Sequence, residues 1–98
     1  MNTRRYEITP RAKRDLLEIG RFTGKTWGKE QRDRYLKALT DRFDWLAEFP
    51  RAGQSFEEVR PNLHAFSEGS HTIFYGLASD RIEIVRVLHR RMSTEGKI

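Results

Sequence analysis

The stretch SHTIFYGLASDRIEIVRVLHRRM, residues 70–92, decides the fold. Two apolar runs rich in β-branched and aromatic residues, 71–77 and 82–88, flank a short polar turn at residues 78–81. Runs of this length around a tight turn predict two neighbouring antiparallel strands. The second run is apolar on both faces, which predicts that its strand lies in the interior of the sheet.

The second run ends abruptly at one edge of the predicted sheet. We call this segment the basic edge; it consists of His89, Arg90, Arg91 and Met92. Arg90 and Arg91 follow the strand and are expected to be exposed. Such a segment is suited to contact another macromolecule, and an ordinary solvated strand end has the same composition.

Arg86 lies inside the second run. Because side chains alternate along a strand, Arg86 and Leu88 are expected to share a face with Ile82 and Ile84. An arginine on an apolar face is partly buried and needs a carboxylate or carbonyl partner. We therefore expect a structural role for Arg86.

A first helix is predicted near the N-terminus. Thr9 is a favourable N-cap and Pro10 a favourable first helical residue. Apolar residues then recur at three- and four-residue steps over residues 10–23, which predicts an amphipathic helix with Gly24 as its stop.

A second helix is predicted over residues 29–48, after a connection at residues 25–28. Pro50 ends this pattern, because the residue before a proline avoids helical geometry. Two helices joined by a short connection are expected to lie antiparallel, as a helical hairpin.

Two further strands complete the prediction, at residues 4–8 and 63–67. The segment 50–62 is expected to be a loop, with a short pairing near residues 58–60. The sequence thus predicts an α+β fold with the order β-α-α-β-β-β and a helical hairpin packed on an antiparallel sheet.

The chain has 98 residues, which predicts one domain over residues 1–98 with a polar tail, 93–98, that frays. A chain this short has little room for a deep cavity, so we expect function on a surface or a shallow groove. The formal net charge is +5, from 19 Lys and Arg against 14 Asp and Glu, which fits nucleic acid or an acidic protein as partner and equally fits charge that serves solubility alone.

Cysteine is absent, which excludes disulfides and thiolate zinc sites. The N-terminus has no apolar signal region, and no apolar run approaches the roughly 20 residues that span a bilayer. We therefore expect a soluble, cytoplasmic protein without a membrane partner.

Few residues have the spacing of a catalytic or metal-binding motif. His64, His71 and His89 lack metal-ligand spacing, so neither a metal nor another cofactor is expected. Asp15 and Glu18 are expected on a solvated helix face as surface charge. The basic residues, namely Arg60, Arg86, His89, Arg90 and Arg91, include the residue types that a metal-free ribonuclease uses to stabilise a phosphorane and move protons.

Short blocks along the chain carry a resemblance to a known family. The more specific ones are GSH-x-IFY at residues 69–75 and RVLH-x-RM at residues 86–92. Further residues match in order and spacing: Ile8-Thr9-Pro10-Arg11-Ala12, Asp15-Leu16, Ile19, Trp27-Gly28, Gln31, Tyr35, Leu46-Ala47, Pro50 and Gly53. Over about residues 5–92 the chain resembles the ParE branch of the RelE/ParE toxin superfamily.

This resemblance implies the toxin of a bacterial type II toxin–antitoxin module that inhibits DNA gyrase, arrests growth and helps to maintain plasmids. It implies a non-catalytic toxin, neutralised by a ParD-like antitoxin in a hetero-oligomer of 2:2 or higher stoichiometry. It also implies that operator DNA is contacted only through the antitoxin.

The RelE branch gives the alternative function, a ribosome-dependent mRNA endonuclease. Members of that branch carry an arginine where Thr72 is found here, and a tyrosine or histidine near the C-terminus. The tail after Arg91 has no tyrosine, which favours the gyrase inhibitor, whereas His89 and Arg90 are what would remain of a nuclease site.

Two sets of candidate site residues follow. The target-binding candidates are His89, Arg90, Arg91, Met92 and Arg60, the last expected near the basic edge. The antitoxin-binding candidates are the large aromatic residues Trp27, Tyr35 and Trp45, which are expected to offer an apolar track to a partner helix.

Overall fold

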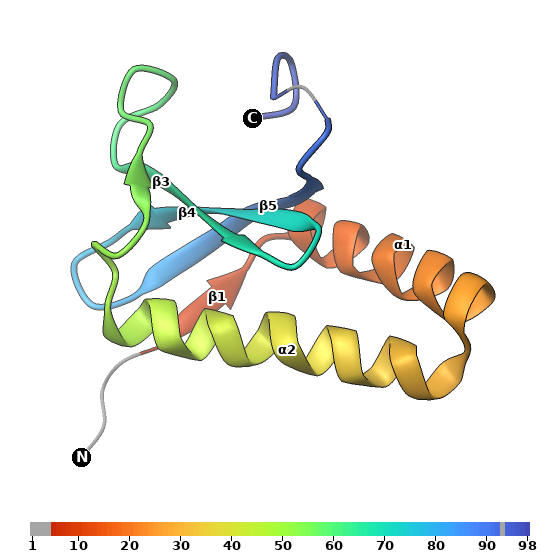
Figure 1. Ribbon diagram of the computed structural model, residues 1–98. Coiled ribbons are helices and arrows are strands. Elements are labelled where there is room, and N and C mark those ends of the chain that lie inside the picture. Colours follow the sequence, from red (N-terminus) through yellow and green to blue (C-terminus); the bar gives the residue numbers. More distant parts are fainter. Residues whose placement is uncertain (1–4, 93) are drawn as a thin grey trace.

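The computed structural model describes residues 5–92 and 94–98. The two helices are α1 (Pro10–Trp27) and α2 (Lys29–Glu48). The strands are β1 (Tyr6–Ile8), β2 (Gln54–Ser55), β3 (Leu63–Glu68), β4 (His71–Leu77) and β5 (Ile82–His89). Both helices cover one face of a five-stranded sheet of order β1-β5-β4-β3-β2 (Figure 1). The α+β fold with a helical hairpin on a sheet is therefore confirmed, as is the interior position of the last strand.

The sheet is mixed, so the prediction of a wholly antiparallel sheet was wrong. β1 pairs with β5 in parallel, whereas the β2–β3, β3–β4 and β4–β5 pairs are antiparallel. An alternating pattern indicates that a segment is a strand. It does not indicate whether that strand runs parallel or antiparallel to a partner that is distant in sequence, as β5 is from β1. The short pairing expected near residues 58–60 is also wrong, because β2 forms at Gln54–Ser55 instead.

Helix α1 extends beyond its predicted stop. Gly24 lies within the helix, and a Cβ there would be 3.3 Å from Cδ of Arg32 on α2. At Gly20 a Cβ would be 3.2 Å from Cδ1 of Leu36, so both glycines allow the helices to approach closely. The helix ends at Gly28, whose φ of +97° favours glycine. The connection is thus a single residue, and Trp27 belongs to α1.

A β-bulge in β5 changes which residues share a face. Phe74 pairs with Arg86 but Tyr75 pairs with Ile84, so Val85 has no partner in this register. Ile82, Ile84 and then Val87 face the helices, whereas Leu88 packs on the opposite face. The expectation that Arg86 and Leu88 share a face with the isoleucines was therefore wrong, because strict alternation does not survive a bulge.

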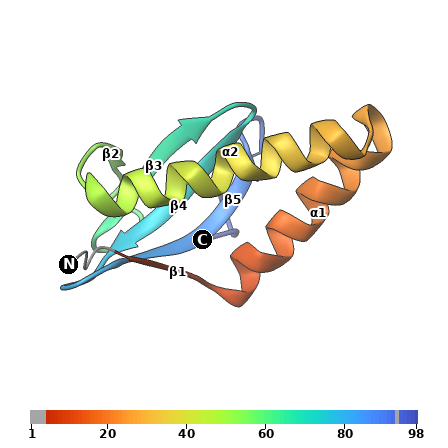
Figure 2. The same ribbon diagram turned by 90° about the horizontal axis from the view of Figure 1, so that it is seen from below.

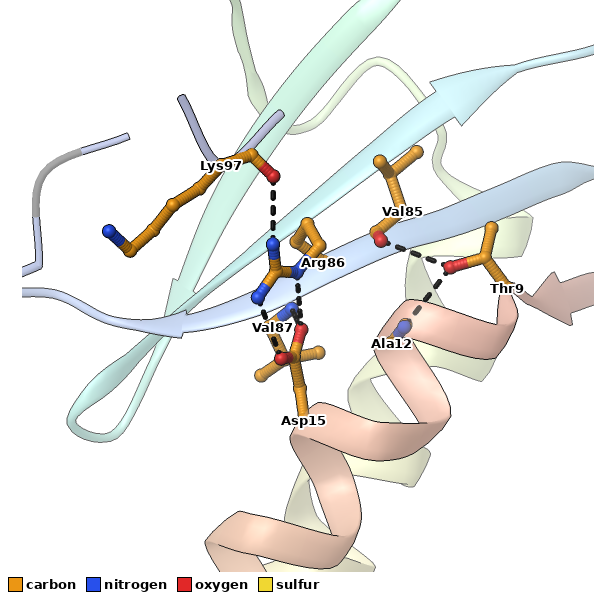
Figure 3. A network of polar contacts seen from close by, with 7 residues as sticks. All are labelled: Thr9, Ala12, Asp15, Val85, Arg86, Val87 and Lys97. Carbon is orange, nitrogen blue, oxygen red and sulfur yellow. Dashed lines mark hydrogen bonds and ion pairs between the residues drawn. The ribbon is translucent and has the colours of Figure 1, made fainter. Parts of the chain in front are cut away.

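Beyond the end of β1, side chains of α1 complete the edge of β5 (Figure 3). The Thr9 hydroxyl donates to the Val85 carbonyl at 3.0 Å and accepts from the Ala12 N–H at 3.1 Å, which confirms the N-cap. Asp15 Oδ2 accepts the Val87 N–H at 2.9 Å. Asp15 is 9% exposed, so its expected place on a solvated face was wrong.

Arg86 donates to the same carboxylate through two nitrogens. The Nε–Oδ2 distance is 2.8 Å and the Nη2–Oδ1 distance is 2.9 Å. Its third nitrogen, Nη1, donates to the Lys97 carbonyl at 2.8 Å. The sequence predicted a carboxylate or a carbonyl partner for Arg86, and this prediction is confirmed because Arg86 has one of each.

The sheet carries apolar clusters on both faces. The larger cluster, under the helices, is centred on Leu39, Phe43, Ile73 and Tyr75. On the other face the cluster contains Leu63, Ala65, Phe74, Val85 and Leu88, with Phe56 and Ile98 packed against it. The described part of the tail, residues 94–98, lies on this side of the sheet, opposite the helices (Figure 1). Ile98 and the Lys97 carbonyl thus give it partners that the sequence did not indicate.

Within the described residues, neither helix combines the length and the apolar character that crossing a membrane requires.

Candidate functional site

A groove of about 490 Å³ lies between α1, the start of α2 and the end of the sheet where β5 finishes. The helical hairpin extends beyond the edge of the sheet on this side (Figure 2). Apolar residues of α1 line the groove, among them Ile19, Phe22 and Trp27. Phe22 and Trp27 are 67% and 70% exposed, which is unusual for such large apolar side chains. The groove therefore offers an uncovered apolar surface.

The floor of the groove is polar, but its charged atoms already have hydrogen-bond partners. Asp15 and Arg86 both line it, and each uses its charged atoms on the other. The hydrogen bond to Asp15 raises the pKa of Arg86 above its ordinary value. This ion pair joins α1 to β5. Because the guanidinium of Arg86 is already bound to Asp15, it is poorly placed to stabilise a reacting phosphate.

Tyr35, His71 and His89 form a contiguous group on one wall. The Tyr35 hydroxyl lies 2.6 Å from His71 Nδ1 and accepts the Ser70 N–H at 3.0 Å. When His71 is neutral and carries its proton on Nε2, its Nδ1 accepts a hydrogen bond from the Tyr35 hydroxyl. The His71 and His89 rings meet edge to face, with centroids 5.4 Å apart. Gly69 lets the Tyr35 ring lie close to the turn between β3 and β4, because a Cβ at this position would be 2.8 Å from that ring.

Two pKa shifts follow from this packing. Burial, and then the nearby His89, lower the pKa of His71 below its ordinary value of 6.5. Burial is also the main reason that the pKa of Tyr35 is raised. His71 therefore stays neutral, and Tyr35 keeps its proton, at neutral pH.

The basic edge continues from this wall into solvent. His89 is half-buried and its Nδ1 accepts the Arg91 N–H at 3.2 Å. The Arg90 N–H donates to the Ser70 carbonyl at 2.9 Å, which fixes the backbone. Arg90, Arg91 and Met92 are exposed, as expected for the two arginines, and Met92 also lines the groove.

Two predicted site residues lie elsewhere. Arg60 is at the opposite end of the sheet, where its guanidinium is 3.9 Å from Glu83, so its expected closeness to the basic edge was wrong. Trp45 packs against Phe49 and Phe66, with the guanidinium of Arg42 4.7 Å from its ring centre. The groove thus brings together Trp27 and Tyr35 with the basic edge, but not Trp45 or Arg60.

Sequence reasoning missed three residues of the groove. The apolar pattern over residues 10–23 left open whether Phe22 or Thr23 lies on the packed face, and the structure buries Thr23 and exposes Phe22. Asp15 lies three residues after Ala12 and four before Ile19, a spacing that places it on the packed face. His71 has no local signal, because its partner Tyr35 is on another element.

Comparisons with known proteins agree with this architecture. Residues 6–94 match a family described as the ParE toxin of the type II toxin-antitoxin system parDE. A relative named Toxin ParE1, from Mycobacterium tuberculosis, is 40% identical over 92 residues, covering 93% of this chain and 94% of the relative. Toxin ParE1 from Caulobacter vibrioides is 36% identical over 93 residues, covering 95% and 96%.

Solved structures share the fold at lower identity. A chain of a chromosomal ParDE toxin–antitoxin system from P. aeruginosa has a TM-score of 0.74 and 15% identity, covering 89% of this chain and 96% of that one. A chain of the RelBE2 toxin–antitoxin complex from Mycobacterium tuberculosis has a TM-score of 0.67 and 21% identity, covering 91% and 100%.

The lowered pKa of His71 predicts a dependence of stability on pH. The unfolded chain binds a proton near pH 6.5, whereas folded His71 binds it only at lower pH. The free energy of unfolding should therefore fall as pH drops below about 6.5 and continue to fall until folded His71 is protonated. Urea unfolding at about pH 7.5, 6.5 and 5.5 measures this decline.

The substitution His71→Gln should flatten this decline. His64→Gln is the matched control, since His64 is a histidine of the neighbouring strand β3 that pairs with Tyr75 rather than His89. Equal pH dependence in the wild-type chain and in His71→Gln would contradict the assignment.

Proposed function

Because the chain belongs to the ParE family of toxins from type II toxin–antitoxin systems, we propose that it inhibits DNA gyrase by binding rather than by catalysis. We further propose that a helix of a ParD-like antitoxin occupies the groove and holds the toxin inactive. The observation that carries both proposals is that the groove and the basic edge lie at the same end of the molecule.

Three features support binding over mRNA cleavage. Thr72 lies where the nuclease branch carries an arginine, and the tail lacks a tyrosine. The sheet face away from the helices is filled by the apolar cluster around Phe74 and Leu88 and partly covered by Phe56 and Ile98. The pocket beside this cluster is lined by His89 and Arg90, and Arg90 is the only arginine among its described lining residues, so it offers few cations to stabilise a phosphorane. We therefore assign the basic edge to target contact.

The groove suits an amphipathic antitoxin helix. A helix that presents apolar residues at intervals of three and four can cover Phe22, Trp27 and Met92, which are otherwise exposed. Acidic residues at one end of that helix would meet the basic edge. The ParDE and RelBE2 structures that share the fold are toxin–antitoxin systems, which favours a partner of this kind. We expect a hetero-oligomer with at least two copies of each chain.

The groove can be tested by truncating one exposed apolar side chain of α1. Phe22→Ala should weaken binding of the cognate antitoxin about 10- to 100-fold, as truncation of a central aromatic anchor typically does. Leu17→Ala is the matched control, because Leu17 is similarly exposed, at 64%, but does not line the groove. Isothermal titration calorimetry measures both. Equal losses for the two variants would place the antitoxin elsewhere on the toxin.

The basic edge can be tested against gyrase. The purified chain should inhibit supercoiling by gyrase, and Arg90→Ala with Arg91→Ala should weaken inhibition about tenfold or more while leaving the thermal melting temperature nearly unchanged. Arg51→Ala with Arg60→Ala is the matched control, since it removes two exposed arginines from the other end of the sheet.

Three outcomes of this assay are informative. Inhibition that is lost only with the Arg90 and Arg91 substitutions supports the proposal. Unchanged inhibition by the variant with Arg90→Ala and Arg91→Ala would show that the gyrase contact lies outside the basic edge. Gyrase that remains fully active, together with mRNA cleavage on ribosomes, rejects gyrase inhibition in favour of the nuclease.

A further inference from the structure

The outer side of α1 carries a row of basic residues that the proposed function does not use. We call it the basic stripe; it consists of Arg11, Arg14, Arg21 and Lys25. The spacings of three, seven and four residues correspond to whole numbers of helical turns, so the four side chains lie on one side of the helix. All four are exposed. At 1.5 Å per residue the stripe is about 21 Å long.

The basic residues of the stripe differ from most basic residues of α2 in having no ion pair with another described residue. On α2, Arg32, Arg34, Lys37 and Arg42 each have an acidic partner within 4 Å. No such ion pair joins any stripe residue to another described residue. Of the acids on α1, Asp15 is bound to Arg86. Glu18 lies within the row itself, four residues after Arg14 and three before Arg21, but it forms no ion pair with a described stripe residue, so the row keeps a net charge of about +3. The positive charge of the helical hairpin is therefore concentrated along α1.

We propose that the basic stripe binds the phosphate backbone of duplex DNA without reading its sequence. Arginine makes forked hydrogen bonds to phosphate, and a straight helix holds its cations in a fixed row. Duplex DNA presents a phosphate about every 3.4 Å along each strand, so the stripe spans roughly six steps. This inference goes beyond gyrase inhibition and does not rest on it. It also adds a direct DNA contact to the one expected through the antitoxin.

The surroundings of the stripe favour duplex DNA over other polyanions. Binding of unpaired bases relies on stacking aromatic side chains, and the exposed aromatic residues of α1, Phe22 and Trp27, line the groove rather than belong to the stripe. Insertion into a membrane interface needs a continuous free apolar helix face, whereas Ala12 and Ile19 of α1 are buried in the core and the exposed Phe22 and Trp27 line the groove. A duplex requires only the row of cations.

Fluorescence anisotropy with a labelled duplex of arbitrary sequence, about 20 base pairs long, tests this proposal. The purified chain should bind with a slope of log K against log salt concentration of about −3 to −4 between roughly 50 and 200 mM NaCl. Arg14→Ala with Arg21→Ala should make that slope shallower by about 2, since each lost phosphate contact removes about 0.9. Circular dichroism checks that the variant melts as the wild-type chain does.

The matched control is Arg34→Ala with Lys37→Ala on α2. It removes the same two charges, but from side chains that already have acidic partners. The proposal requires the control to change the slope by less than half as much as the α1 variant. Equal changes in the two variants, or a wild-type slope near zero, would overturn it. Tighter binding to single-stranded RNA, or to vesicles of anionic phospholipid, than to the duplex would also overturn it.

Discussion

The structure depends on one buried carboxylate, that of Asp15. It accepts two hydrogen bonds from Arg86 and a third from the Val87 N–H. β1 ends at Ile8, whereas β5 continues to His89, so the edge of β5 beyond β1 needs other partners for its backbone groups. Thr9 and Asp15 provide them (Figure 3). The carboxylate can be buried because a forked arginine and a backbone donor replace its water.

The same ion pair connects parts of the chain that are distant in sequence. Arg86 reaches from Asp15 on α1 to the Lys97 carbonyl in the tail, and Ile98 then packs on the second apolar cluster. The pair also forms the floor of the groove, so α1 is held to the sheet where the groove begins. Farther along, α1 continues to Trp27, while Gly20 and Gly24 keep it close to α2. Because this part of the hairpin extends beyond the sheet, Phe22 and Trp27 are exposed.

Local sequence signals were sufficient for much of the fold. The Thr9-Pro10 cap, the second helix and the two long strands were predicted because each depends on neighbouring residues. The parallel direction of β1 and the bulge at Val85 were not, because both are set by partners far along the chain. Gly24 misled the prediction of the helix end, since a packing glycine and a terminating glycine are identical in sequence.

The candidate site was predicted in part for the same reason. The basic edge follows a strand directly, so the exposure of Arg90 and Arg91 could be predicted from local sequence. The Tyr35–His71 contact joins α2 to β4, and the groove itself arises from the relative positions of three elements. Arg60 was placed near the basic edge by charge alone, whereas the strand register places it at the other end of the sheet.

The most direct test is the coupling free energy between Asp15 and Arg86. Urea unfolding of Asp15→Ala, Arg86→Ala and the double variant gives this quantity as a double-mutant cycle. Each single substitution leaves the partner's charge or hydrogen-bonding atoms unpaired, so each should cost about 3–5 kcal/mol. The double variant should be no less stable than either single one, which corresponds to a coupling of about 3 kcal/mol or more. Losses that add to within about 0.5 kcal/mol would contradict the central role of this pair.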